Sequence, residues 1–152
     1  MSTATVGDFM TRRVETINVA SSVQEAAKKM KEKDISSLVV VDDRNKPLGL
    51  MTERDIVRKV ASVYDSVTIS SMKNADVLSF PLITVRSDSS PEAAADLLIE
   101  NKIRHLLVVD KEDADKPVGI ITPMDFTRYK DSRKSDSDDD DPVTRILEYY
   151  RD

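Results

Sequence analysis

Cysteine is absent from this 152-residue sequence, and histidine occurs once, at position 105. A chain without cysteine forms no disulfide and no thiolate metal site, and it gives no indication of its redox compartment. The chain has three glycines and no glycine-rich phosphate-binding loop. No serine, histidine and aspartate stand at a spacing typical of a catalytic triad. We therefore predict a protein that is not an enzyme and uses no metal or catalytic cofactor.

Long hydrophobic stretches are also missing. The longest apolar runs cover residues 38–41 and 106–109, whereas a membrane-spanning helix needs about 20 apolar residues. Residues 1–6 have neither a basic flank nor an apolar run, so they do not resemble a signal peptide. We therefore expect a soluble, cytoplasmic protein with no membrane partner.

Neither acidic nor basic side chains are in clear excess except near the C-terminus. The net charge is −5, and residues 131–152 alone hold eight acidic and four basic side chains. The remainder is nearly balanced and shows no basic footprint for nucleic acid. The lysines of residues 28–33 are diluted by Glu25 and Glu32, a mixture typical of a solvated helix face. A nucleic-acid partner is therefore not expected.

The most informative feature that is present is an internal repeat. The pair Thr16-Ile17 reappears as Thr84-Val85, 68 positions later. After residue 45 the offset becomes 70, and the matched pairs are Gly49 and Gly119, Thr52 and Thr122, and Asp55 and Asp125. A repeat of this length predicts two similar units related by a pseudo-twofold axis, with ligand sites in pairs.

Each repeat predicts the order strand, helix, strand, strand, helix. Ser22 and Ser90 stand where a hydroxyl can cap a helix, with Glu25 completing a capping box and Pro91 at a first helical position. Apolar spacing predicts amphipathic helices from residues 23 and 91. The runs 38–41 and 106–109 predict strands buried on both faces, followed by short strands at 48–51 and 118–121.

The C-terminal region combines an acidic tract with a short amphipathic segment. Residues 138–141 are four adjacent aspartates, but a calcium site needs spaced ligands, so a solvated linker is the favoured interpretation. A helix is predicted from Pro142, with Val143, Ile146, Leu147 and Tyr150 on one face. Because so short a helix is marginal alone, it must either dock or fray.

The residues that carry chemistry lie where the second helix of each repeat begins. Thr52 and Asp55, like Thr122 and Asp125, form a Thr-x-x-Asp turn at a strand end. The threonine hydroxyl and free N–H groups can bind a phosphate or sugar oxygen. The carboxylate can accept hydrogen bonds from the two hydroxyls of a ribose. The alternative is purely structural, with threonine as the helix cap and aspartate at the positive helix end.

Further motifs link the repeats to a known family. The motifs are Val14-Glu-Thr-Ile17, Ile35-Ser-Ser-Leu-Val-Val-Val-Asp42 and Gly49-Leu-Met-Thr-Glu-Arg-Asp55, matched by Leu82-Ile-Thr-Val85, Ile103-Arg-His-Leu-Leu-Val-Val-Asp110 and Gly119-Ile-Ile-Thr-Pro-Met-Asp125. Since all of them occur twice and in order, residues 6–130 resemble a tandem pair of cystathionine-β-synthase (CBS) domains, a Bateman module.

This resemblance implies a fold and its boundaries. The expected fold is α+β, with two lobes that are each a small, mainly parallel sheet with two helices, packed by pseudo-twofold symmetry. The implied segments are a first CBS domain at 6–60, a linker at 61–73, a second CBS domain at 74–130, the acidic tract at 131–141 and the short helix at 142–152.

The resemblance also implies ligands and two clefts between the repeats. Members of the family bind AMP, ADP, ATP, S-adenosylmethionine or NAD. The implied main cleft combines Asp125 and Thr122 for ribose and phosphate, Arg104 and His105 for phosphate, and Thr16 and Ile17 for the base. The implied second cleft combines Asp55 and Thr52 with Thr84 and Val85, and has Ser36 and Ser37 in the places of Arg104 and His105.

The two clefts are not equivalent. The small hydroxyls of Ser36 and Ser37 cannot neutralise a phosphate as a guanidinium does, so the second cleft is expected to bind weakly, to accept a nucleoside or to stay empty. Arg104 is either a surface ion-pair residue or, as we favour, a phosphate clamp. His105 is either a half-buried neutral residue or a phosphate donor whose pKa rises when an anion binds.

Together these features predict a regulatory CBS-pair protein that senses an adenine nucleotide and forms a homodimer. The regulated partner cannot be named from the sequence. One alternative is a dimeric scaffold whose clefts do not bind ligand. Another is a nucleic-acid-associated protein, for which steeply salt-dependent binding would be the signature.

Overall fold

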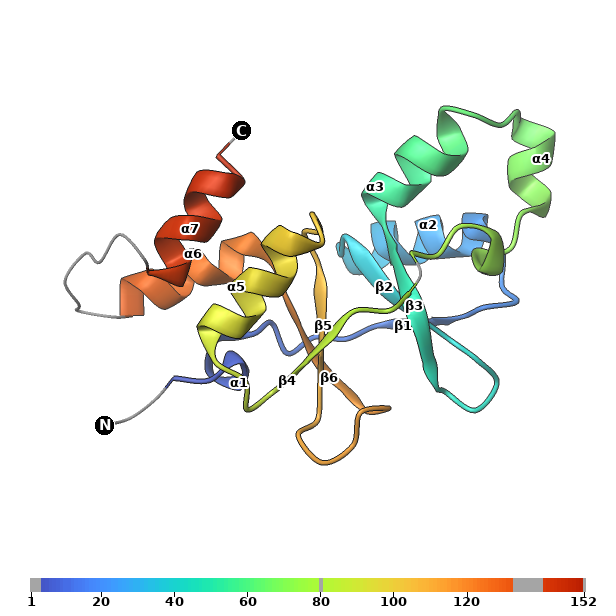
Figure 1. Cartoon of the computed structure of the whole chain (residues 1–152). Coiled ribbons are helices and arrows are strands. Elements are labelled where there is room, and N and C mark those ends of the chain that lie inside the picture. Colours follow the sequence, from blue (N-terminus) through green and yellow to red (C-terminus); the bar gives the residue numbers. More distant parts are fainter. Residues whose placement is uncertain (1–3, 80, 133–140, 152) are drawn as a thin grey trace. The chain divides into compact units, whose positions relative to one another are not determined.

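The computed structural model describes residues 4–79, 81–132 and 141–151 (Figure 1). The chain divides into two compact units, one formed by residues 14–82 and the other by the N-terminal residues up to 13 together with the residues from 83 onward. Each unit has its own hydrophobic core. No helix within the described residues is long and apolar enough to cross a membrane.

The first unit is built on a three-stranded sheet. Its elements are β1 (Thr16–Asn18), α2 (Val23–Lys33), β2 (Ser37–Val41), β3 (Pro47–Thr52), α3 (Glu53–Asp55), the π-helical η1 (Ile56–Ala61), α4 (Ser66–Ser71) and the 3-10 turn η2 (Asn74–Asp76). The strand order is β1-β2-β3, with β1 parallel and β3 antiparallel to β2.

The second unit repeats this topology. Its elements are α1 (Val6–Phe9), β4 (Thr84–Arg86), α5 (Pro91–Glu100), β5 (Leu106–Val109), β6 (Pro117–Ile121), α6 (Pro123–Ser132) and α7 (Pro142–Tyr149). The predicted α+β class and element order are therefore confirmed. The prediction of mainly parallel sheets was wrong, because each sheet has one parallel and one antiparallel pair.

Local sequence signals explain where the first helix of each repeat begins. The Ser22 hydroxyl accepts the Glu25 N–H at 3.1 Å, and the Ser90 hydroxyl accepts the Ala93 N–H at 3.2 Å. Satisfying an otherwise unpaired helix N–H group is the usual role of a serine at this position. The strands β2 and β5 carry consecutive buried side chains, as their apolar runs predicted.

Each sheet is extended by the segment that precedes the other repeat in the sequence. We call residues 4–13 the N-terminal arm and residues 74–79 the linker arm. Thr11 and Ile120 exchange two backbone hydrogen bonds of 2.9 and 2.8 Å, and the Ser79 N–H donates to the Leu50 carbonyl at 2.8 Å. The N-terminal arm thus belongs to the compact unit that contains the second repeat, and the linker arm to the one that contains the first.

A glycine in β3 and another in β6 permit this close approach. A Cβ on Gly49 would lie 2.6 Å from the Ser79 carbonyl oxygen, and one on Gly119 would lie 2.9 Å from the Thr11 carbonyl oxygen. Both distances are below ordinary van der Waals contact, so any side chain would push the arm away. The Gly of each repeat is thus required by the arm and not by its own backbone conformation, since neither glycine has a positive φ.

The C-terminal helix α7 docks on the second unit. Val143 and Ile146 are buried in the same core as residues of α5 and α6, and Arg145 pairs with Asp96 of α5 at 2.7 Å. The helix begins at Pro142 as predicted, although the Asp141 side chain accepts no capping hydrogen bond from its N–H groups. The acidic tract predicted at 131–141 lies largely outside the described residues.

We predict that Gly49→Ala lowers the free energy of unfolding by about 1–3 kcal/mol, the usual cost of forcing extra volume into a packed contact. Urea denaturation followed by circular dichroism measures the change. The matched control is Gly7→Ala, whose Cβ would lie 3.1 Å from the nearest carbonyl oxygen and needs a much smaller adjustment. Equal stability of the two variants would show that the linker arm does not pack on Gly49 as described.

Candidate functional site

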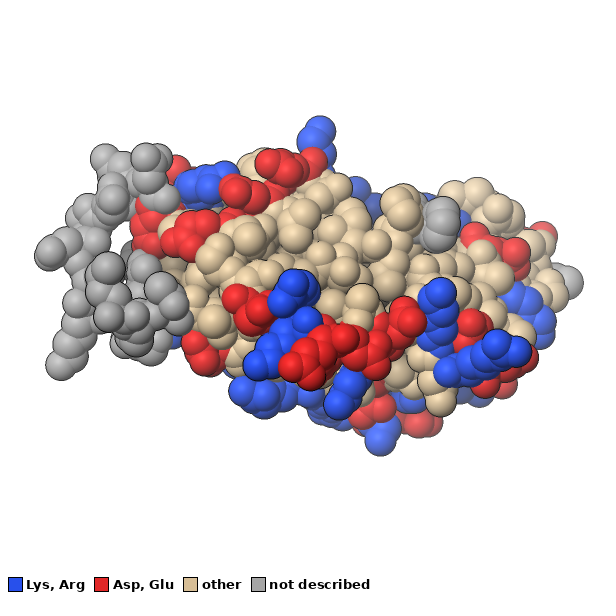
Figure 2. Space-filling model, turned by 60° about the horizontal axis from the view of Figure 1, so that its bottom comes forward, with Lys and Arg blue, Asp and Glu red and all other residues tan. Residues whose placement is uncertain are grey.

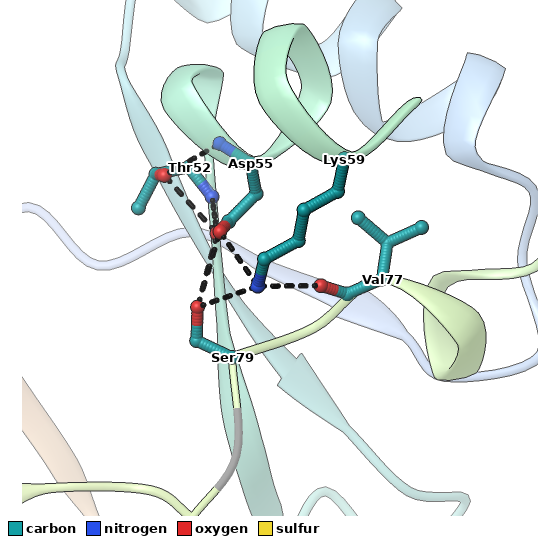
Figure 3. Close-up of polar contacts among 5 residues, drawn as sticks. All are labelled: Thr52, Asp55, Lys59, Val77 and Ser79. Atoms are coloured by element: carbon teal, nitrogen blue, oxygen red, sulfur yellow. Dashed lines mark hydrogen bonds and ion pairs between the residues drawn. The ribbon is translucent and has the colours of Figure 1, made fainter. Parts of the chain in front are cut away.

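The first-unit carboxylate, Asp55, is surrounded by donors from three parts of that unit (Figure 3). Its Oδ2 accepts the Thr52 N–H at 2.9 Å and the Thr52 hydroxyl at 3.1 Å, at the end of β3. The Ser79 hydroxyl of the linker arm lies 3.2 Å from both carboxylate oxygens. Lys59 of η1 places its Nζ 3.0 Å from Oδ1. These donors allow the Asp55 side chain to be largely buried, with 11% of it exposed.

The second-unit carboxylate, Asp125, has an equivalent set of partners. Its Oδ2 accepts the Thr122 N–H at 2.8 Å, and its Oδ1 accepts the Thr11 hydroxyl at 2.9 Å. Arg128 forms an ion pair with Oδ1 and donates to the Thr11 hydroxyl at 3.1 Å. Asp125 is 1% exposed, while the Arg128 side chain is 61% exposed. The most buried charged group of the unit therefore has an exposed cation as its counter-ion.

The structural interpretation of the Thr-x-x-Asp turn is realised in the first unit, whereas in the second unit the Asp125 N–H donates to the Thr122 backbone carbonyl at 3.0 Å. The Thr52 hydroxyl accepts the Asp55 N–H at 3.2 Å while the Asp55 carboxylate accepts the Thr52 N–H, a reciprocal capping arrangement. Capping does not prevent a second role, because the Oδ1 oxygens face the arm hydroxyl and the cation. A sugar hydroxyl that replaces the cation could be accepted at the same oxygen.

Four residues of these sites were missed by the sequence reasoning: Thr11, Ser79, Lys59 and Arg128. A signal for the first two exists, because Thr11 and Ser79 stand at the same offset of 68 that relates Asp8 to Asp76. Those two aspartates both accept the N–H group three residues earlier, in Thr5 and Lys73 respectively. The arms therefore belong to the repeat and share its offset.

The residues predicted to face a phosphate lie at the start of the middle strands. In the first unit Ser37 pairs with Thr52, and the Ser36 carbonyl accepts the Glu53 N–H at 3.0 Å, so both serines lie next to the Thr-x-x-Asp turn. In the second unit Arg104 and His105 precede Leu106, which pairs with Ile121 beside Thr122. Each unit thus brings its predicted phosphate-facing pair and its carboxylate to the same end of the sheet.

The residues predicted to frame the base lie on β1 and β4. Ile17 and Val85 point their side chains into the cores of their own units, where they are buried. Their contribution to a ligand would therefore come from the backbone. Thr16 is exposed, and its carbonyl accepts the Lys29 ammonium at 2.5 Å. The structure does not bring Thr16 and Ile17 together with Asp125 within one unit, nor Thr84 and Val85 with Asp55.

Arg104 has a partner on the C-terminal helix. Its guanidinium carbon lies 5.7 Å from the centre of the Tyr150 ring, a distance typical of a cation–π contact. The Tyr150 hydroxyl donates to the carbonyls of Leu98 and Ile103, which fixes the ring against the turn before β5. The pKa of Tyr150 is raised to about 12, chiefly by burial and also by the neighbouring Tyr149, while Arg104 opposes the shift.

Comparison with known proteins assigns the chain to a family. The sequence model of the CBS domain matches residues 6–62 and 75–132. The chain therefore belongs to the CBS domain family, as a tandem pair. An uncharacterized protein of Methanopyrus kandleri is 36% identical over 130 residues, covering 86% of this chain and 64% of the relative. The CBS domain-containing protein YhcV of Bacillus subtilis is 32% identical over 133 residues, covering 87% and 89%. The chain spans less than two thirds of the Methanopyrus protein.

Solved structures agree with this assignment. A conserved CBS domain protein of unknown function from Thermoplasma acidophilum superposes with a TM-score of 0.77 at 28% identity, covering 97% of this chain and 76% of that protein. CBSX2 in complex with AMP gives 0.66 at 29%, covering 83% and 95%. The CBS domain pair of protein MJ0100 in complex with 5-methylthioadenosine and S-adenosylmethionine gives 0.73 at 26%, covering 88% and 100%.

We predict that Thr11→Val destabilises the protein by about 1.5–3 kcal/mol, because the buried Asp125 carboxylate loses a hydrogen bond that nothing else can replace. Chemical denaturation measures the loss. Thr11→Ser keeps the hydroxyl and serves as the control, with an expected change much smaller than that of the valine variant. Equal losses in both variants would mean that the methyl group of Thr11, and not its hydroxyl, holds the N-terminal arm.

The raised pKa of Tyr150 predicts a pH-dependent contribution to stability. Folding favours the protonated phenol, so this contribution is complete below the ordinary tyrosine pKa of about 10. It is lost as the pH rises toward the folded-state pKa of about 12. The difference in thermal midpoint between wild type and Tyr150→Phe should therefore shrink between these two pH values. A constant difference across the interval would contradict the buried, donating hydroxyl.

Proposed function

We propose that this CBS-pair protein is a regulatory sensor of an adenine nucleotide, with AMP, ADP or ATP as the expected ligands, and that it has no catalytic activity of its own. The observation that carries the proposal is the duplicated cluster of Asp55 and Asp125 with their arm hydroxyls and cations. Two CBS pairs of similar fold contain adenosine-type ligands, AMP in one and methylthioadenosine with S-adenosylmethionine in the other.

The chemistry of each unit supports this ligand class. Asp125 offers a carboxylate to which the two ribose hydroxyls can donate, once Arg128 moves from Oδ1. Arg104 and His105 supply positive charge and N–H donors at the same end of the sheet for a phosphate. In the first unit, Asp55 supplies the same carboxylate beside Ser36 and Ser37. Base contacts by Thr16, Ile17, Thr84 and Val85 stay predictions.

The sensor also needs an element that responds to the ligand. Arg104 lies against Tyr150 of α7, so a phosphate that attracts Arg104 changes the contacts of that helix. A ligand shifts such an equilibrium only through different affinities for the two states. Release or tightening of α7 would be the change that a partner protein detects.

One observation favours a second function, a self-associating scaffold. Val57 of η1 and Val63 and Tyr64 in the turn that follows expose large apolar surface, with Val57 at 61% exposure. Apolar side chains gathered on one short segment are typical of interaction surfaces, and we infer a homodimer contact there. The nucleic-acid alternative has less support, because basic and acidic side chains lie interspersed on the face shown in Figure 2.

Calorimetric titration of AMP, ADP, ATP, S-adenosylmethionine and NAD tests the proposed function. The proteins are wild type, Asp125→Asn and Asp55→Asn. Asparagine keeps a carbonyl oxygen for the helix cap, so it removes the charge with less damage than alanine. We expect wild type to bind at least one adenine nucleotide, and we expect Asp125→Asn to weaken that binding by about tenfold or more, because a charge-assisted hydrogen bond to the ribose is lost.

The other outcomes separate the alternatives. Loss of binding in Asp55→Asn alone would move the working site to the first unit. Binding that survives both substitutions would show that neither carboxylate holds the ribose. Absence of binding by wild type across the whole panel would overturn the sensor proposal and favour the scaffold.

A further inference from the structure

The cation that pairs with Asp55 is not the residue that the sequence repeat predicts. At the offset of 70, Arg58 matches Arg128, which pairs with Asp125. In the first unit the contact is instead made by Lys59, the next residue. The π-helical element η1 begins directly after Asp55, and a π turn holds more residues than an α-helical turn. Lys59 stands four residues after Asp55, whereas Arg128 stands three residues after Asp125.

The ammonium of Lys59 can exchange its contact with the carboxylate for solvent. Its side chain is 49% exposed, and its contacts to the Val77 carbonyl and the Ser79 hydroxyl are both 3.5 Å, at the outer limit of a hydrogen bond (Figure 3). Its ammonium lies 3.0 Å from Oδ1 of the largely buried carboxylate, but water can hydrate the exposed ammonium when it leaves. Lys59 is also the most exposed of the residues that donate to Asp55, since Thr52 and Ser79 are partly buried.

The Asp55 carboxylate has no acceptor capacity to spare. An ionised carboxylate offers about four acceptor positions. Thr52 donates to it through both its N–H and its hydroxyl, Ser79 lies within reach of both oxygens, and Lys59 holds Oδ1. A ribose that donates hydroxyls to Asp55 must therefore displace a donor, and Lys59 is the one displaced at the lowest cost.

We propose that Lys59 determines the ligand specificity of the first-unit site, by exchanging Asp55 for the phosphate of a bound nucleotide. This inference rests on the proposed function. In the empty site Lys59 competes with the ribose for Oδ1. Once displaced, its ammonium on a flexible four-carbon stem is available to a phosphate, which lysine binds as a compact point charge. In the site where Ser36 and Ser37 stand in the places of Arg104 and His105, Lys59 would thus supply the positive charge.

The exchange has opposite consequences for two probes. Adenosine has the ribose but no phosphate, so it displaces Lys59 without offering it a new partner. AMP has both the ribose and the phosphate, so its phosphate gives the displaced Lys59 ammonium a new ion-pair partner. Removal of the ammonium should therefore help adenosine and harm AMP.

The test compares Lys59→Met with Arg58→Met by calorimetric titration of AMP and of adenosine. Both carry Asp125→Asn, so that the first-unit site is observed alone. Methionine keeps an unbranched stem and removes the charge, and Arg58→Met removes the same charge one residue away. We expect Lys59→Met to weaken AMP about threefold to tenfold and to strengthen adenosine up to about threefold. Arg58→Met should change both affinities by less than about twofold.

The outcomes distinguish this inference from the proposed function. The exchange of Lys59 between Asp55 and the phosphate is overturned if Lys59→Met changes the AMP and adenosine affinities in the same direction. It is also overturned if Lys59→Met and Arg58→Met have equal effects. Either result leaves the proposed function as a sensor intact. Binding of neither probe by the wild-type protein would overturn both. Circular dichroism confirms that each variant is folded. If Asp125→Asn does not fold, Lys59→Met and Arg58→Met are compared in the wild-type chain. There, Lys59→Met must change one of two binding phases, weakening it for AMP and strengthening it for adenosine.

Discussion

The buried carboxylates Asp55 and Asp125 are the constraint on which each unit depends. Removing an ionised carboxylate from water costs several kcal/mol unless donors surround it. In both units the donors come from the end of the third strand of the sheet, β3 or β6, from an arm, and from a cation on the following helix. The same group therefore fixes the strand, the helix and the arm, and the close approach at Gly49 and Gly119 lets the arms reach it.

A carboxylate whose acceptor positions are already occupied can bind the proposed ligand only if one of its donors is replaced. Under the proposed function, a ribose would not enter an empty acceptor position but would compete with a cation of the chain, and the outcome would depend on what the released cation can bind. The two units differ in this respect, with lysine on a π-helical turn in one and arginine on an α-helix in the other. In the second unit, Arg104 also lies against Tyr150, which connects the same end of the sheet to α7.

Much of this arrangement could be predicted from the sequence, because its signals are local. The caps at Ser22 and Ser90, the apolar strands and the Thr-x-x-Asp turns are each determined within a few residues. The mixed sheets were also within reach, since five to seven residues cannot make the crossover that parallel strands require. The contact of Thr11 with Asp125 joins residues 114 positions apart, and the pairing of Asp55 with Lys59 instead of Arg58 departs from the offset of the repeat. The apolar stripe of α7 predicted docking or fraying but could not identify the surface.

The most direct measurement is a crystal structure of the protein with AMP. The account predicts the ribose hydroxyls within hydrogen-bond distance of the carboxylate of Asp125 or Asp55. It also predicts that the associated cation, Arg128 or Lys59, has left that carboxylate. A ribose bound elsewhere, with both carboxylates still paired to their cations, would contradict the account.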